Sequence, residues 1–569
     1  MNERPDFFMS HPLKIAISAT NEGLTPPPAA SQTAVDAMFR SALSAHREGR
    51  VADAYEGYRR VLARDTSHAD ATYLIGVIEQ KQGRQTETEG AYRRALQLQP
   101  DFAENLIGIG ILFSQIKWIA EAETAFHRAL ELHPDMADAY NNLGTLFAES
   151  RRFVEAEAAY CRALEINPAM ASTHCNLGTL FAESRRFVEA EAAYRRVLEL
   201  SPYSAEAHVN LGNLFMRTRR FVEAETAFLR ALELKPDYVE VRVNLGFCLL
   251  HLGRYREAWD YYESRCHVDP KDSGITPPQF LPFPEWKGQP LANKSLVIWQ
   301  EQGFGDQVQF VRYASLLKRR GASRITVVCD PVLGPLLETA EGVDAVITNP
   351  NLVPLHDYWS MFLSLPRHFG TTVESIPTPL PYVFPLRERT QRWQKKLPGD
   401  GLRVGLVWKG SAPHKNDANR SLSALSALSP LWSVPGVTFV SLQKGHDDAA
   451  PPPAEQPITA LGLDIHDFAD TAAIVAQLDL VICVDTAVAH VAGALAKPCW
   501  VLLPFSGTDW RWLQDRSDSP WYPKGMRLFR QSEHDSWTDV IDKVATALGN
   551  WALTHPRAKS NMAAKVLPK

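Results

Sequence analysis

The sequence predicts an α-helical solenoid followed by an α/β region made of two doubly wound halves. One observation behind this fold class is a fixed spacing of 34 residues, which is typical of solenoids built from paired helices. The other is an alternation of apolar strands and helical stretches, in two sets, in the rest of the chain. The spacing is marked by Pro100, Pro134, Pro168, Pro202, Pro236 and Pro270.

The composition is that of an ordinary globular protein, and the 569 residues are too many for one core. A formal net charge of −5 gives no overall attraction to nucleic acid or to anionic lipid. The chain lacks an apolar run of about 18 residues, so no membrane span is expected. Seven cysteines without a Cys-x-x-Cys pair, and a start without a long apolar stretch, predict reduced thiols and a cytoplasmic protein.

The chain is expected to divide into seven segments. A leader with three consecutive prolines at its end is expected to be disordered, and about seven helical repeats follow it. The expected boundaries are a leader over 1–33, a solenoid over 34–272, a proline and aromatic junction over 273–293, α/β halves over 294–385 and 401–552, a linker over 386–400 and a flexible tail over 553–569.

Other residues repeat in register with the prolines. A glycine lies 24 residues before each proline, and an aromatic residue lies 8 before it, as in the pair Gly178 and Tyr194. Small residues let paired helices approach closely, while the aromatic ring fills the space between them. This pattern resembles the tetratricopeptide repeat, with its Leu-Gly pair, alanine, aromatic and closing proline. The segments 142–165 and 176–199 are nearly identical, which predicts uniform geometry.

Asparagine occupies one position, just before the Leu-Gly pair, in four consecutive repeats. It is a mediocre helix former, and its amide offers both a donor and an acceptor. In tetratricopeptide glycosyltransferases of the O-linked N-acetylglucosamine type, a similar ladder binds the backbone of an extended acceptor peptide, and the resemblance implies a peptide groove here. Alternatively, the amides brace neighbouring repeats. The four residues are Asn142, Asn176, Asn210 and Asn244.

Pairs of arginines fall in the turns between paired helices. They occur at 151–152, 185–186 and 219–220. Charged residues in a turn are usually solvated, and we expect these arginines to face water.

In the α/β region, strands are expected over 295–300, 324–330, 345–348, 402–408, 437–442, 480–484 and 499–503, with helices over 307–320 and around 331–339. A glycine loop over 301–306 follows the first strand, as in a dinucleotide-binding enzyme. Val308 replaces the third glycine of that motif, and Asp306 would put negative charge where pyrophosphate lies. These departures argue against a dinucleotide site.

Three segments resemble the heptosyltransferase-like (GT9-like) group of glycosyltransferases with a GT-B fold, which has two Rossmann-like halves. They are Gly-Phe-Gly-Asp-Gln at 303–307, Gly-Leu-Val-Trp-Lys-Gly-Ser at 405–411, and the stretch 484–494 with its Asp-Thr-x-x-x-His motif. Together with the repeats, the chain is similar to bacterial tetratricopeptide glycosyltransferases, including those that modify flagellin. The resemblance implies that Asp306 is the catalytic base.

The residue types agree with sugar transfer. A carboxylate on a glycine-freed loop can take the proton of an acceptor hydroxyl, although Asp306 also suits a helix cap. Lys409, Ser411 and the amides near Thr486 would stabilise the leaving phosphate, since the region has no Asp-x-Asp metal motif and no metal is expected. Asp485 and His490 would contact the donor; the alternatives are a helix cap and a core histidine, and for Lys409 an exposed strand end.

Two further groups are candidates for the donor site. His414, Asp417 and Arg420 lie in a polar loop that suits a mobile flap. Arg511 lies in a stretch rich in tryptophan and arginine, where aromatic rings stack on sugars and arginine pairs with carboxylate or phosphate. Ordinary packing also explains the tryptophans. If Arg511 faces the donor, an acidic nine-carbon sugar becomes the favoured donor.

The resulting hypothesis is a protein O-glycosyltransferase. A groove of the solenoid would capture a protein acceptor, flagellin by resemblance, and the α/β region would transfer a sugar from a nucleotide-sugar co-substrate, with no other cofactor. Direct displacement without a metal would invert the anomeric centre. The alternatives are a transferase acting on lipopolysaccharide or another glycan, with repeats for assembly, and a non-enzymatic scaffold.

Overall fold

The structure is a computed structural model that describes residues 30–99, 103–268, 277–278, 280–399, 401–414, 416–444, 457–532 and 536–555. The expected leader up to residue 29, Pro100, Pro270 and the tail beyond residue 555 lie outside these residues. The chain divides into two compact units, Met1–Pro202 and Tyr203–Lys569. Among the described residues, no helix has the length and apolar character needed to cross a bilayer.

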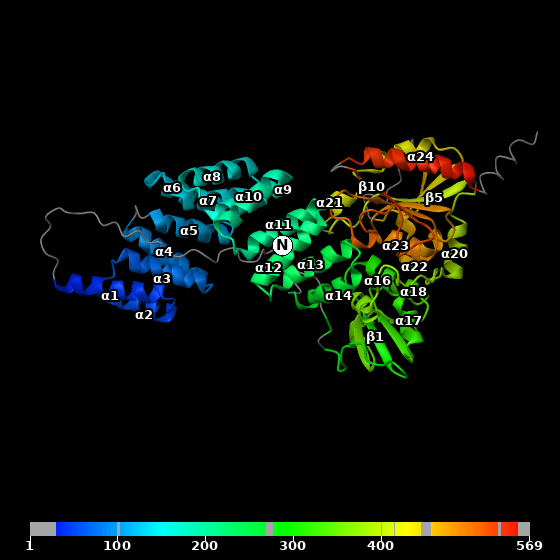
Figure 1. Cartoon of the computed structure of the whole chain (residues 1–569), viewed down its shortest axis with the longest axis horizontal. Coiled ribbons are helices and arrows are strands. Elements are labelled where there is room, and N and C mark those ends of the chain that lie inside the picture. The colour runs from blue at the N-terminus through cyan, green and yellow to red at the C-terminus, as the bar shows by residue number, and fades with distance from the viewer. Residues whose placement is uncertain are drawn as a thin grey trace, which may run out of the picture. The chain divides into compact units, whose positions relative to one another are not determined.

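The first unit consists of paired helices, as the 34-residue spacing predicts (Figure 1). Each pair has a first helix of about the same length as its second, and successive pairs pack in order. The helices are α1 Ala30–Arg47, α2 Val51–Arg64, α3 Ala69–Lys81, α4 Gln85–Leu98, α5 Ala103–Gln115, α6 Ile119–Leu132, α7 Ala137–Glu149, α8 Phe153–Ile166, α9 Ala171–Glu183 and α10 Phe187–Leu200.

The repeated glycine and aromatic residues pack against each other, which confirms their predicted role. A methyl group added at Gly178 on α9 would lie 2.7 Å from Tyr194 Cε1 on α10. The same contact joins Gly144 to Tyr160, at 2.6 Å. These distances are too short for any real side chain, so glycine is needed where the paired helices meet.

The arginines of the turns have different roles. The expectation of solvated charge holds for Arg151 and Arg185, but Arg219 is half-buried, with its guanidinium carbon 5.3 Å from the centre of the Phe505 ring. Arg151 is exposed, with φ at 61°. Arg152 instead lies over the Phe147 ring, 4.1 Å from its centre, and its Nη1 is 2.7 Å from Glu123 Oε2 in the preceding repeat. Because Arg186 contacts Phe181 and Glu157 in the same way, this position cross-links successive repeats.

The second unit begins with two more helical pairs and continues into the α/β region. The pairs are α11 Ala205–Arg217 with α12 Phe221–Leu234, and α13 Val239–His251 with α14 Tyr255–Tyr262, followed by the 3-10 turn η1 Glu263–His267. The last repeats therefore belong to the same compact body as the α/β region.

The α/β region contains two parallel sheets, as predicted. The first has the strand order β3-β2-β1-β4 and the second the order β10-β9-β8-β5-β6-β7. The predicted strands are all present, while β4, β7 and β10 were not predicted. The strands are β1 Ser295–Trp299, β2 Arg324–Val328, β3 Ala345–Ile347, β4 Tyr358–Met361, β5 Leu402–Val407, β6 Val437–Ser441, β7 Ile458–Ala460, β8 Leu480–Val484, β9 Cys499–Leu503 and β10 Met526–Arg530.

The second sheet has the strand order of doubly wound nucleotide-binding folds. Counted from β5, the order is 3-2-1-4-5-6, and the order reverses between β5 and β8. Helix α24 Thr538–Thr554 covers one face of this sheet through Val540, Val544 and Leu548 (Figure 1). In sheets of this kind, ligands bind at the carboxyl ends of the strands beside the reversal.

Short helices and 3-10 turns connect the strands. The helix predicted over 307–320 is wrong as a single element, because an i to i+3 hydrogen bond from Ala314 N to Val311 O divides it. The remaining elements are α16 Phe304–Phe310, α17 Tyr313–Arg319, α18 Gly334–Leu337, α19 Leu365–His368, α20 Arg387–Gln394, α21 Asp417–Arg420, α22 Phe468–Val475, α23 Ala487–Ala494, η2 Pro350–Leu352, η3 Phe362–Ser364, η4 Leu425–Ser433, η5 Gly462–Asp464 and η6 Trp510–Trp512.

Replacing Gly178 with alanine should lower the free energy of unfolding by about 1–3 kcal/mol, because the new methyl group overpacks the contact with Tyr194. Gly90 offers a matched control, since it lies inside α4 and nothing lies within 4 Å of an added methyl group. Gly90→Ala should raise the free energy of unfolding by about 0.5–1 kcal/mol. Urea unfolding followed by circular dichroism measures both, and equal effects would contradict the packing role.

Candidate functional site

The predicted donor-binding residues come from the two strands beside the reversal of the second sheet. Asp485 directly follows β8, and Thr486 precedes α23. Lys409 follows β5 by two residues, and the two strands pair with Val407 opposite Cys483. The sequence placed these residues at the ends of strands, and the topology brings those ends together.

Asp306 lies at the start of α16 and makes contacts with both of its oxygens. Its Oδ2 accepts a hydrogen bond of 2.9 Å from the Gly303 backbone N–H, so the carboxylate does cap the helix. Its Oδ1 accepts from Nη2 of Arg511, which belongs to the other α/β half. The two halves therefore meet at this carboxylate.

Arg511 is buried between two carboxylates. Its Nη1 donates to Asp509 Oδ2 at 2.6 Å, and its backbone N–H donates to Asp509 Oδ1 at 2.8 Å. The guanidinium carbon lies 4.5 Å from the centre of the Trp510 ring. Among the described residues, its buried Nε makes no hydrogen bond. The arginine is thus part of a charged triad with Asp306 and Asp509.

Two carboxyl groups near this triad have raised pKa values. Burial raises the pKa of Asp306 to about 6, although the Arg511 charge opposes the shift. Burial, together with the negative charge of Asp509, raises the pKa of Asp485 to about 7. Groups that titrate near neutral pH suit proton transfer, and such groups are common at functional sites.

His490 is a buried histidine that supports the Asp306 loop. Its Nδ1 is 2.9 Å from the Tyr522 hydroxyl, and its ring stacks on Trp512 with centres 5.4 Å apart. A methyl group added at Gly305 would lie 2.6 Å from His490 Cδ2, so this glycine is what lets α16 and α23 pack closely. The alternative of a satisfied core histidine accounts for these contacts; a contact with the donor stays a prediction.

Thr486 is the residue before α23, but its side chain does not cap the helix. Its buried hydroxyl makes no hydrogen bond to a nitrogen or oxygen atom of the described residues. A buried hydroxyl normally has a good hydrogen-bond partner, and here the Cys483 thiol supplies only a weak one. The Thr486 hydroxyl remains the best candidate in this corner for a group that binds a ligand.

The loop predicted to be a flap is tied to the second sheet. Asp417 and Arg420 pack on Gly410, where an added methyl group would lie 2.6 Å from Asp417 Oδ1. Asn416 Nδ2 donates to Gly507 O at 2.7 Å. His414 and Ser411 are exposed. The movement of this loop stays a prediction.

The repeated asparagines contact the preceding repeat. Asn176 Nδ2 donates to Asn141 Oδ1 at 3.1 Å in the first unit, and Asn244 Nδ2 donates to Asn213 Oδ1 at 3.1 Å in the second. Asn142 and Asn210 are half-buried at the equivalent position. Bracing of neighbouring repeats therefore occurs, and binding of a peptide by the same amides stays a prediction.

Several residues of the site were not singled out from the sequence as site residues. They include Asp509 and Tyr522, which hold Arg511 and His490. The sequence offered one signal for them, since both lie in the stretch rich in tryptophan and arginine. Tyr522 meets His490 across 32 positions, which sequence spacing does not reveal, whereas Asp509 lies only two residues from Arg511.

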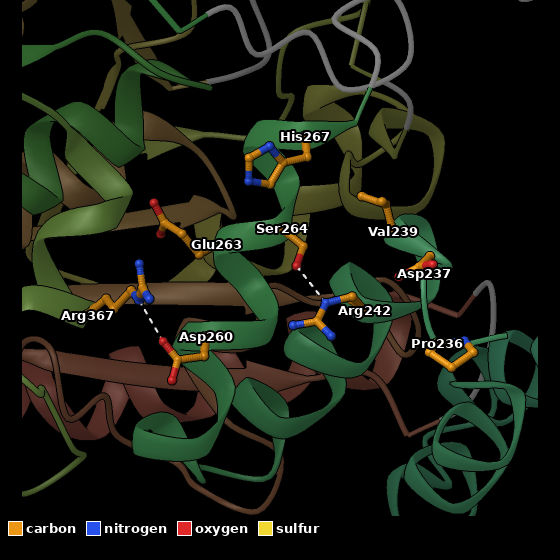
Figure 2. A pocket seen from close by; sticks show the side chains of 9 residues that line it. All are labelled: Pro236, Asp237, Val239, Arg242, Asp260, Glu263, Ser264, His267 and Arg367. Carbon is orange, nitrogen blue, oxygen red and sulfur yellow. Dashed lines mark hydrogen bonds and ion pairs between the residues drawn. The ribbon is translucent and has the colours of Figure 1, made fainter. Parts of the chain in front are cut away.

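A separate pocket of about 400 Å³ lies beside the last repeat (Figure 2). Two hydrogen bonds join residues of its lining: Arg367 Nε donates to Asp260 Oδ1 at 2.7 Å, and Arg242 Nε donates to Ser264 Oγ at 3.1 Å. None of the residues predicted to be catalytic or donor-binding lines it. The lining residues are Pro236, Asp237, Val239, Arg242, Asp260, Glu263, Ser264, His267 and Arg367.

Comparison with known families covers the helical part of the chain. A family model described as tetratricopeptide repeat matches residues 39–101, 119–171, 175–239 and 209–267. The repeats are tetratricopeptide repeats. These matches include the glycines and aromatic residues whose packing is described above, and they end before the α/β region.

Three similar proteins contain related sequence or structure. Protein FlbA of Caulobacter vibrioides is 28% identical over 323 residues, and the match spans about half of each chain, 52% of both. The structure of Pseudomonas aeruginosa PilF is 22% identical and covers 37% of this chain and 96% of that one, with a TM-score of 0.34. YrrB is described as a tetratricopeptide protein with an unusual peptide-binding site. Its structure is 20% identical and covers 33% of this chain and 96% of its own, with a TM-score of 0.27.

The buried His490 should make the protein sensitive to acid. Burial and the Arg511 charge lower its pKa to about 3, whereas an unfolded histidine titrates near 6.5. The unfolded state therefore binds more protons between these values, and the stability that a neutral His490 allows is lost as pH falls below 6.5. From pH 6 to pH 5, the free energy of unfolding should fall by up to about 1 kcal/mol more in wild type than in His490→Gln. His133→Gln, at an exposed histidine, should show the same change in the free energy of unfolding between pH 6 and pH 5 as wild type. An equal change in wild type, His490→Gln and His133→Gln would contradict this account.

Proposed function

We propose that the protein is a protein O-glycosyltransferase of the GT-B type, with a nucleotide-sugar donor and a protein acceptor held by the tetratricopeptide repeats. The observation that carries the proposal is the meeting of Asp306 and Arg511 from two α/β halves, next to the strand ends that hold Lys409, Asp485 and Thr486. Ligands of doubly wound folds bind at such strand ends. The cytoplasm, where nucleotide sugars are made, is the proposed location.

Asp306 is the proposed general base. It would take the proton of a serine or threonine hydroxyl while the hydroxyl oxygen bonds to the anomeric carbon of the sugar. The bond from that carbon to the nucleotide phosphate breaks, and the phosphate leaves with the electron pair. Attack from the face opposite the phosphate inverts the anomeric centre. A pKa of about 6 leaves the carboxylate ionised at neutral pH and still basic enough to accept the proton.

The donor would be held by groups that stabilise negative charge. Lys409, Ser411 and the Thr486 hydroxyl lie at or just beyond the strand ends, and Arg511 would exchange its contact with Asp306 for an anionic group of the donor. This exchange also frees an oxygen of Asp306 for the acceptor hydroxyl. A sugar that carries a carboxylate suits Arg511 because guanidinium and carboxylate pair bidentately.

The repeats would hold the acceptor in an extended form. The asparagine amides each keep hydrogen-bonding capacity after bracing a neighbouring repeat, since an amide has two donor hydrogens and an acceptor oxygen. Flagellin is the acceptor that the sequence resemblance favours. Intact-mass spectrometry of proteins retained by the full chain, from cells with and without it, tests this directly: an added sugar mass only in cells with the chain supports the proposal, and no difference contradicts it.

Asp306→Asn should lower sugar transfer roughly a hundredfold or more while the protein stays folded, because a general base is lost. Asp467→Asn is a matched control, since Asp467 also caps a helix and pairs with an arginine, Arg389, and has no proposed part in proton transfer. Transfer is measured by mass spectrometry of the modified acceptor, and folding by circular dichroism. Wild-type turnover in folded Asp306→Asn would rule out the base assignment.

Replacing Asn210 and Asn244 together with alanine should raise the acceptor Kd roughly tenfold, because two hydrogen bonds to the peptide backbone are lost. Fluorescence anisotropy with a peptide from the modified acceptor measures the affinity. The rise in melting temperature caused by the nucleotide sugar should not change. Glu165→Ala, on the exposed surface of α8, is the control. An unchanged Kd in the double variant would leave the asparagines with bracing alone.

A further inference from the structure

The loop that carries Arg511 has little support of its own. Arg511 lies in η6, a 3-10 turn of three residues between β9 and β10. The turn ends at Leu513, whose φ of 47° is in the left-handed region that a branched side chain rarely adopts. So short a turn needs contacts from elsewhere to hold a charged side chain in one place.

Those contacts come from the last tetratricopeptide repeat. Trp510 is buried edge-on against two aromatic rings of α14: Tyr255, with centres 5.5 Å apart, and Trp259, with centres 5.8 Å apart. The two α14 residues are one helical turn apart. Both rings therefore pack against the Trp510 ring.

The Trp510 ring in turn contacts Arg511 of the charged triad. The Arg511 guanidinium carbon lies 4.5 Å from the centre of Trp510 and 5.2 Å from that of Phe310. Nη2 of the Arg511 guanidinium donates to Asp306 Oδ1. A continuous stack therefore runs from α14 through Trp510 and Arg511 to Asp306.

Helix α14 is itself fixed to both α/β halves. Trp259 Nε1 donates to Thr371 O at 2.7 Å, on the side of the first sheet. Trp521 Nε1, in the second half, donates to the Tyr255 hydroxyl at 3.2 Å. A shift of α14 relative to either half would therefore move the Tyr255 and Trp259 rings that pack against Trp510.

We infer that Trp259 and Tyr255 are positioning residues of the transfer site, which hold Arg511 against Asp306 through Trp510. The last repeat is then a component of the site as well as the end of the acceptor-binding solenoid. The inference rests on the proposed function only where sugar transfer is measured, because the position of Arg511 has a separate readout.

The test compares Trp259→Phe with Trp393→Phe in the full chain. Trp393 is a matched control: it is a buried tryptophan on α20 whose Nε1 donates one hydrogen bond, to Asp470 Oδ1 at 3.0 Å, away from the site. Phenylglyoxal modifies accessible guanidinium groups, and peptide mass mapping gives the rate at Arg511. Trp259→Phe should be modified at Arg511 severalfold faster than wild type, and Trp393→Phe at the wild-type rate.

The pH profile of turnover gives a second readout that a loss of stability alone would not move. Trp259→Phe should lower turnover roughly tenfold. The Arg511 charge also holds the pKa of Asp306 down, so a displaced Arg511 should shift the acid limb of the pH profile to higher pH. Trp393→Phe should keep the wild-type limb.

The outcomes separate this inference from the proposed function. Equal Arg511 modification and equal pH profiles in the two variants would overturn the positioning role. Absence of sugar transfer by wild type would overturn the proposed function, while the phenylglyoxal rates would still decide the positioning role. If Trp259→Phe does not fold, Tyr255→Phe replaces it, since that change removes only the hydroxyl that accepts from Trp521.

Discussion

A buried arginine, Arg312, joins the two α/β halves in the arrangement on which the site depends. Arg312 donates to Gln309 O at 2.8 Å in the first half, to Pro377 O at 3.1 Å, and to Trp521 O at 2.9 Å in the second half. A further bond of 2.9 Å goes to the Tyr382 hydroxyl. A buried charge is costly unless its donors are satisfied, and here carbonyls and aromatic rings satisfy them. The arrangement is therefore specific, because the acceptors are backbone carbonyls of both halves.

The sequence was enough to predict the parts of the fold that repeat or alternate. The spacing of Gly178 and Tyr194 reports a contact within one repeat, so a local pattern predicts it correctly. The strands that were missed, β4, β7 and β10, lie at the edge of their sheets, where pairing with a neighbour defines a strand more than its own residues do. The single predicted helix over 307–320 failed at Arg312, whose side chain serves the contacts between the halves.

Individual residues of the candidate site could be predicted from the sequence, but the contacts between them could not. Asp306, Asp485 and Arg511 were chosen from three separate motifs, and nothing in their spacing shows that Arg511 binds Asp306 across 205 positions. The role of Tyr522 is likewise set by a contact across 32 positions, with His490, whereas Asp509 meets Arg511 two residues away. The segment expected to be a linker, 386–400, shows the same limit: its helix α20 packs against α22 through an ion pair between Arg389 and Asp467. Contacts between residues far apart in the sequence decide these roles, and such contacts cannot be predicted from a single sequence.

The nearly identical repeats α7–α8 and α9–α10 present the same surface to their neighbours. Arg152 bonds to Glu123 as Arg186 bonds to Glu157, and Gly144 meets Tyr160 as Gly178 meets Tyr194. A repeat copied or deleted at this point would keep the Arg–Glu and Gly–aromatic contacts that these repeats share. The solenoid can therefore change length in steps of 34 residues by unequal recombination, with no compensating substitution in the repeats that pack on the α/β region. Natural variants of this chain are free to differ in repeat number while keeping the same α/β region.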